Sequence, residues 1–396
     1  GTVTDLLQTI PSVMVDMDGN VSLRGSGNVT ILINGRPSVV AGAANLEQMP
    51  ASLVEKIEVI TNPSAKYKPD GTAGIINIIL KKERKTGFNG IAGVNAGNND
   101  RFNTNLQLNF NTGKVNLFGS YGFRQDYRQR TSTLSSQTID TAAKQSTWLY
   151  QKVDGSAQPR AHLAQLGLDW DISSRDVAGL SGVYNYRLVK RRDNTTNLYE
   201  DNFQQPSEEF TRYHSGKETE SSAGLTAFFE HTFNKNSEHK VHAGIEYERD
   251  QETEHDAYTN VYFYPESPEE RDTTIADNRE QNINMTLDYS RPLWKDASLE
   301  TGYEGNIQIT DQNMDVANLD PVSGKWIANQ PEGNKFHANQ AVHALFATVS
   351  YTWKKVSVMG GLRAEEARVN LEFKSLDTIA KSDYFALYPT IHLGYA

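Results

Sequence analysis

Phe102-Asn103-Thr104-Asn105-Leu106-Gln107-Leu108-Asn109-Phe110 is the stretch that decides the fold of this 396-residue chain. Phenylalanine, threonine and leucine occupy every second position, and asparagine or glutamine fills the positions between them. Successive side chains of a β-strand point to opposite faces, whereas a helix would repeat about every 3.6 residues. The stretch therefore predicts a β-strand with one apolar and one polar face.

The same alternation continues from Phe88 to the end of the chain. It returns most clearly at 241–248, 283–289, 299–309 and 345–353. We expect about twelve antiparallel strands, each of the length that crosses a bilayer.

The connections between these strands favour a membrane barrel over a soluble sheet. Short turns are expected at 111–113, 173–175, 234–238, 291–296 and 354–355, and long polar loops at 131–157, 201–217, 259–278 and 313–334. Aromatic residues such as Trp170, Tyr184, Trp294 and Trp353 gather near the expected strand ends. Outer-membrane barrels combine short periplasmic turns, long extracellular loops and aromatic girdles, while a soluble sandwich has turn signals about every 8–12 residues.

Composition excludes several other classes of protein. There is no cysteine, so neither a disulfide framework nor a thiolate metal site is expected. The net charge of −10 argues against binding to nucleic acid, which needs a basic surface. The longest strongly apolar run, Gly74–Leu80, is far too short for a membrane helix, so any passage through lipid requires a β-barrel.

Residues 1–82 have a different pattern, which predicts a small mixed α/β domain. A short helix is expected at 5–10, before Pro11, and a helical pattern covers 46–55. Strands are expected at 13–15, 21–23, 29–33, 56–60 and 74–80. A charged linker at 81–85 closes this domain, and residues 83–396 form the barrel region.

Several motifs of the first region occur together and in a fixed order. They are Asp5-Leu6-Leu7 with Ile10-Pro11-Ser12-Val13, then 18–25, 29–36, 49–60, Asn62-Pro63-Ser64-Ala65-Lys66-Tyr67, and 71–78. In this order, ahead of a barrel-like region, they resemble the plug domain of TonB-dependent outer-membrane transporters. The last two motifs are the most specific.

The resemblance implies a mainly β fold: a plug domain followed by an antiparallel up-and-down transmembrane β-barrel. It implies an outer-membrane location with the plug facing the periplasm. Partners would be TonB, outer-membrane lipid, a small-molecule or oligomeric substrate, and a surface lipoprotein in some members. A catalytic activity and a cofactor are not expected.

The chain departs from the family pattern in two ways. Asn34 stands where the family often has aspartate, and Asn62 where many members have glycine; both residues still suit a turn. The TonB box and the first part of the plug are missing, and about 12 of the family's 22 strands are present. We therefore expect a fragment with two unpaired sheet edges, which would close as a smaller barrel or pair with a second copy.

The resemblance also assigns candidate residues. The structural plug motif comprises Arg24, Gly25, Asn34, Gly35, Pro63, Gly71, Gly74 and Asn77. Arg24 would pair with a barrel glutamate and hold the plug, although a surface arginine on a hairpin is the alternative. Plug loops that face the substrate would present Arg36, Pro37, Ser38, Asn45, Asn62, Ser64, Lys66 and Tyr67, or these are ordinary connecting loops.

No catalytic or metal-binding constellation emerges from the remaining residues. Asp16, Asp18 and Asn20 begin like a calcium loop, but the rest of the twelve-residue pattern is absent. His239 and His242 are an odd number apart on an expected strand, so they would face opposite sides.

Three functional hypotheses follow. The first is a gated importer that binds a siderophore, oligosaccharide or peptide and admits it when TonB displaces the plug. The second is a passive porin or surface-binding barrel, against which the plug motifs count. The third is a soluble β-rich interaction module. The polar loops do not distinguish among the substrate classes.

Overall fold

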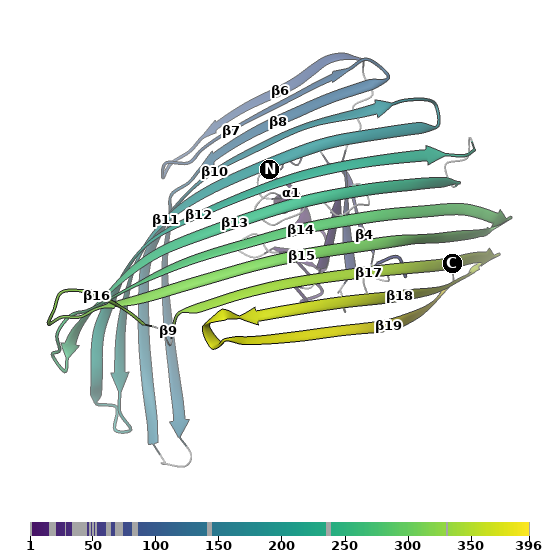
Figure 1. Ribbon diagram of the computed structural model, residues 1–396. Coiled ribbons are helices and arrows are strands. Elements are labelled where there is room, and N and C mark those ends of the chain that lie inside the picture. Colours follow the sequence, from purple (N-terminus) through teal and green to yellow (C-terminus); the bar gives the residue numbers. More distant parts are fainter. Residues whose placement is uncertain are drawn as a thin grey trace.

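The computed structural model describes most of the chain. The described residues are 2–15, 21–27, 29–33, 46, 49, 51, 54–60, 65–67, 74–80, 86–140, 145–234, 239–329 and 332–395. They form a small N-terminal domain and one large antiparallel sheet (Figure 1). The expected linker, and with it the boundary at 82/83, lies outside these residues and stays a prediction.

The small domain contains one helix and two small sheets. Its elements are α1 (Val3–Leu7), β1 (Val13–Val15), β2 (Val21–Leu23), β3 (Val29–Ile33), β4 (Val54–Ile60) and β5 (Gly74–Leu80). β1 and β2 form an antiparallel pair, while β5 lies between β3, to which it is parallel, and β4, to which it is antiparallel. The central place of β5 explains its continuous apolar sequence, because both of its faces are covered.

Two expected elements of this domain were misplaced. The helix begins at Val3 rather than Asp5, because the Asp5 carboxylate accepts a hydrogen bond from the Thr2 amide (2.7 Å) and so belongs to the first turn. The helical pattern expected up to Glu55 is also wrong at its end, since β4 already begins at Val54. Pairing with β5 outweighs the local helical pattern there.

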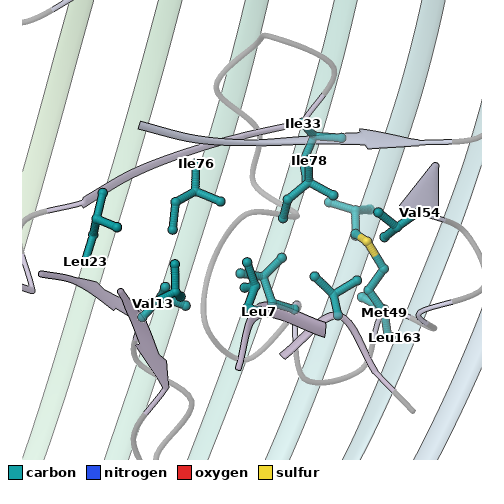
Figure 2. Packing of buried hydrophobic residues seen from close by; sticks show 13 residues of the cluster. Leu7, Val13, Leu23, Ile33, Met49, Val54, Ile76, Ile78 and Leu163 are labelled. Carbon is teal, nitrogen blue, oxygen red and sulfur yellow. The ribbon is translucent and has the colours of Figure 1, made fainter. Parts of the chain in front are cut away.

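The core of the small domain includes side chains from the large sheet. Leu7, Leu23, Ile76 and Ile78 are almost fully buried in one apolar cluster. Leu163, which belongs to the large sheet, joins this cluster beside Met49, as Figure 2 shows; Val183 of the large sheet belongs to it as well. The two parts of the chain therefore share a core.

The large sheet contains fourteen strands within the described residues. Twelve follow one another from edge to edge: β6 (Gly87–Ala96), β7 (Phe102–Asn111), β8 (Val115–Gln125), β10 (Gln145–Asp171), β11 (Asp176–Glu200), β12 (Pro206–Thr232), β13 (Lys240–Tyr264), β14 (Glu270–Trp294), β15 (Ala297–Leu319), β17 (Asn334–Trp353), β18 (Val356–Phe373) and β19 (Thr378–Tyr395). β9 (Arg128–Asp140) pairs with β10, β16 (Trp326–Ala328) pairs with β15, and a 3₁₀ turn, η3 (Lys374–Leu376), precedes β19. The expected up-and-down antiparallel order is confirmed.

Three of the four expected long loops are strands instead, while 313–334 keeps a connection between β15 and β17 that includes only the short β16. β10 and β12 each have 27 residues, far more than the ~9–11 that cross a bilayer. The polar stretches at 131–157, 201–217 and 259–278 are mostly paired strand, and the turn between β11 and β12 is only 201–205. Polar side chains indicate that a segment is exposed to water, but they do not prevent its backbone from pairing with a neighbouring strand.

The sheet curves around the small domain (Figure 1). β6 and β19 are its edge strands, and within the described residues they do not pair with each other. In the part of the chain that the structure describes, no helix combines the length and apolar character needed to cross a membrane.

Candidate functional site

The two faces of the large sheet have the opposite polarity from those of a soluble protein. On β13, Glu246 is 7 % exposed, whereas its neighbours Ile245 and Tyr247 are 50 % and 37 % exposed. On β18, Arg363 is 1 % exposed and Leu362 is 47 % exposed. The inner face, which contacts the small domain, is thus polar, and the outer face is apolar. A barrel wall with lipid outside and a polar interior has this arrangement.

Arg363 on the inner face of β18 connects β18 and β15 with the small domain. Its Nε donates to Glu365 Oε2 at 2.9 Å, and its Nη1 donates to Glu304 Oε2 at 2.8 Å. Nη1 also donates to the backbone carbonyl of Lys66 in the small domain, at 3.1 Å. One guanidinium therefore neutralises two carboxylates and binds the plug-like domain at the same time.

The strand register brings these groups together. Ala344 on β17 pairs with Glu304 on β15 and with Glu365 on β18. Because alanine is small, the Arg363 side chain can pass over it from β18 to reach Glu304 two strands away. Ala344 is only 1 % exposed, as expected for a residue under such a bridge.

Lys66 makes a second polar contact between the two parts. Its Nζ donates to Asp288 Oδ2 on β14 at 2.9 Å. Burial alone would lower the pKa of the Lys66 ammonium, but the Asp288 carboxylate outweighs burial and holds this pKa above its ordinary value. For the neighbouring Tyr67 phenol, whose charged form is the anion, burial raises the pKa.

Gly361 on β18 permits the close approach of the small domain. A Cβ added at this position would lie 2.8 Å from the Cβ of Ala65 and 2.9 Å from the hydroxyls of Thr348 and Thr390. Real Cβ atoms do not come this close, so any other residue at 361 would push the small domain away from the sheet.

The inner face of β13 carries acidic residues at every second position. They are Glu246, Glu248, Asp250, Glu252, Glu254 and Asp256. Two further carboxylates, Glu220 on β12 and Glu280 on β14, line a cavity of about 330 Å³ together with Asp250 and Glu252. The alternation is visible in the sequence, but only the strand register shows that all six positions face inward.

The predicted plug-motif residues that are described have structural roles. Gly74 begins β5 with φ 143° and Gly25 has φ 82°, conformations that favour glycine. Asn77 on β5 donates from Nδ2 to Glu58 Oε2 at 3.0 Å across to β4. Asn34, Gly35, Pro63 and Gly71 lie outside the described residues.

Arg24 agrees with the alternative given for it, a surface arginine on a hairpin, rather than with a pairing to a barrel glutamate. It is exposed in a left-handed turn (φ 53°), and its amide donates to the Ser12 carbonyl at 2.8 Å. Within the described residues its side chain has no ion pair. Because the residue is exposed, burial does not force it to find a carboxylate. The ion pair between a cation of the small domain and a carboxylate of the large sheet is made by Lys66 and Asp288 instead.

The predicted substrate-facing residues are only partly described. Arg36, Pro37, Ser38, Asn45, Asn62 and Ser64 lie outside the described residues. Lys66 and Tyr67 lie against the wall of the large sheet, where Lys66 is held by Asp288 and Arg363. Contact of these residues with substrate stays a prediction. Sequence reasoning missed Arg363, Glu304 and Glu365, because one sequence does not say which strand residues face a second domain.

The described part of the chain contains no cluster of three histidine or carboxylate side chains that could hold a metal ion. His239 bonds to the Tyr289 hydroxyl (3.1 Å) in the turn before β13, while His242 is buried on the inner face.

Comparison with known proteins gives two family matches. Residues 1–75 match the TonB-dependent Receptor Plug Domain, and residues 231–396 match the Outer membrane protein beta-barrel family. Among solved structures, the copper transporter OprC is similar over 99 % of this chain, with a TM-score of 0.60 and 17 % identity. This chain spans 57 % of the length of that protein. The siderophore receptor PiuA from Acinetobacter baumannii is similar over 98 % of this chain and 76 % of its own, with a TM-score of 0.45 and 12 % identity.

Proposed function

This chain belongs to the family of TonB-dependent outer-membrane receptors, and on that basis we propose that it imports a nutrient by energy-coupled displacement of its plug. Its place is the outer membrane, and its family consists of transporters and receptors rather than enzymes. The proposed substrate is a siderophore, an oligosaccharide or a peptide. TonB is the proposed partner on the periplasmic side.

The observation that carries this proposal is the polar contact between plug and barrel. Arg363 and Asp288 hold the plug through one backbone carbonyl and one ammonium, both on Lys66. Such contacts can break when the plug is pulled, because water can replace each partner that leaves. The plug is then the element with two positions, as a gated importer requires.

The ion pairs of Arg363 within the barrel remain when the plug leaves. Arg363 keeps both of its carboxylate partners, Glu304 and Glu365, which belong to the barrel itself. Arg363 is therefore not left as an unpaired buried charge after displacement, which would cost several kcal/mol. This favours a wall that stays folded while the plug moves.

The test is conductance of the full-length protein in planar bilayers, with residues 1–82 present and then deleted. Low conductance with the plug and high conductance without it is the expected result. High conductance in both forms would favour the passive porin. No insertion of either form would leave the soluble module as the better hypothesis.

A further inference from the structure

The imidazole of His214 is held at both nitrogens by carboxylates. Nδ1 lies 3.1 Å from Asp193 Oδ2, and Nε2 lies 2.8 Å from Asp256 Oδ1. Asp193 is on β11, His214 on β12 and Asp256 on β13, so the ring links three neighbouring strands. These residues lie in the halves of β11, β12 and β13 that are nearer to the turn between β11 and β12.

Both bonds can form only when the ring is protonated. An ionised carboxylate only accepts hydrogen bonds, and a neutral imidazole has a single N–H to donate. The imidazolium has two N–H groups and satisfies both aspartates. Because an imidazole can gain or lose this proton, the number of hydrogen bonds that the ring donates depends on pH.

The three side chains are largely buried, and neighbouring glycines leave space for the two carboxylates. Side-chain exposure is 16 % for His214, 10 % for Asp193 and 19 % for Asp256. Gly155 on β10 and Gly216 on β12 leave the space, because a Cβ added at either would overlap the carboxylate of Asp193 or Asp256, respectively.

The charges that face the ring come from each neighbouring strand. Arg130 on β9 donates to Asp193 Oδ1 at 3.2 Å. On β11 Arg191 is paired with Glu218, and on β12 Arg212 is paired with Asp272. On β13, Tyr258 stacks on the His214 ring at 4.7 Å, and Glu254 adds a further negative charge. Asp193 and Asp256 with Arg130 alone carry one excess negative charge, which the imidazolium balances.

A shared metal ion does not explain the arrangement. The two nitrogens point to opposite sides of the ring, so the two carboxylates cannot meet on one ion with the same imidazole. The described residues, including these three, contain no group that could hold a metal.

We propose that Asp193, His214 and Asp256 form a proton-operated clasp across β11, β12 and β13. With the ring protonated, the clasp is closed and the elongated strand ends are held together. As pH rises and the proton leaves, one aspartate loses its donor and the strands loosen at this level. The clasp therefore stabilises at low pH and is lost at high pH, independently of the import function.

The experiment is hydrogen exchange of the full-length protein in detergent at pH 5.5 and 8.0, with rates corrected for the intrinsic effect of pH. Peptides covering 190–196, 211–217 and 253–259 should exchange at least about tenfold faster at pH 8.0, because hydrogen bonds to charged groups are lost. Peptides of β17 and β18 serve as the internal reference. Equal protection at both pH values in the wild type would overturn the proposal.

Three variants separate the clasp from a merely structural histidine. H214Q should exchange fast at both pH values. D256N should stay protected at both, because the Asn amide can donate to the neutral ring at pH 8.0 and its oxygen can accept at pH 5.5. H255Q changes an exposed histidine one position away and should behave as wild type. If H214Q does not fold, D256N decides alone: a pH dependence equal to that of the wild type would refute the clasp.

Discussion

Arg363 is the residue on which the contact between plug and barrel depends most. Arg363→Met would leave the buried Glu365 and the partly buried Glu304 without a cation, and the Lys66 carbonyl without its donor. We expect the free energy of unfolding to fall by about 3–5 kcal/mol, the usual cost of breaking a buried ion pair on one side. Chemical denaturation in detergent, followed by tryptophan fluorescence, measures it.

Arg368→Met is the matched control on the same strand. Arg368 pairs with Glu366, but the two side chains are 70 % and 53 % exposed. Solvent screens an exposed pair, so this variant should be close to wild type. An equal loss of unfolding free energy in both variants would mean that the Arg363 ion pairs stabilise the protein no more than the exposed Arg368 pair does.

The ion pair of Lys66 with Asp288 should not respond to pH in the range where the His214 clasp does. A group whose pKa is raised on folding contributes stability below its ordinary pKa and loses it only as pH rises beyond. For Lys66 this loss begins above about 10.5. A double-mutant cycle with Lys66→Met and Asp288→Asn should give the same coupling, about 0.5–3 kcal/mol, at pH 6 and pH 9. A coupling that vanishes by pH 9 would contradict the ion pair.

At the scale of single elements, β13 is stabilised by pairing and destabilised by its own charge. Successive inward carboxylates on one strand are about 7 Å apart, close enough to repel. We expect the thermal midpoint to rise between 20 and 500 mM NaCl, because salt screens this repulsion. The triple variant Glu248→Gln, Asp250→Asn, Glu252→Gln should lose most of that dependence.

Neutralising Glu266 and Glu269 provides the comparison for the β13 variant. Both lie exposed around the turn between β13 and β14, where solvent already screens them. Their removal should leave the salt dependence nearly unchanged. An equal effect of both sets would trace the repulsion to net charge rather than to the β13 residues.

At the scale of the whole molecule, the apolar outer face distinguishes a membrane protein from a soluble one. Leu166 is 73 % exposed on β10. In a soluble protein Leu166→Arg would change stability by no more than about 0.5 kcal/mol. On a lipid-facing barrel wall the same change costs about 2–4 kcal/mol near the bilayer midplane. Unfolding of the protein from lipid vesicles by urea measures the difference.

Val322→Arg controls for the added charge. Val322 is 94 % exposed and lies in the connection between β15 and β16. Its replacement should be neutral in vesicles. A neutral result for Leu166→Arg as well would place the outer face in water.

The sequence predicted the elements whose pattern is local. Val13–Val15, Val21–Leu23, Val29–Ile33 and Gly74–Leu80 were predicted with their observed bounds. The period of two predicted about twelve strands, and the family resemblance implied their antiparallel order. The family was also recognisable, because its plug motifs are contiguous. Glycines such as Gly74 were identifiable because a positive φ depends on the backbone of that residue alone.

Only the tertiary structure decided the contacts between residues distant in the chain. Arg363 and Glu304 meet because Ala344 is paired with both Glu304 and Glu365, and His214 meets Asp256 through the register of β12 and β13. The length of the strands was also a tertiary outcome: polar stretches such as 206–217 pair with neighbours that the local pattern does not reveal. The physical reason is the same in each case. Alternation determines which face a side chain takes, whereas register, a property of two strands together, determines what it touches there.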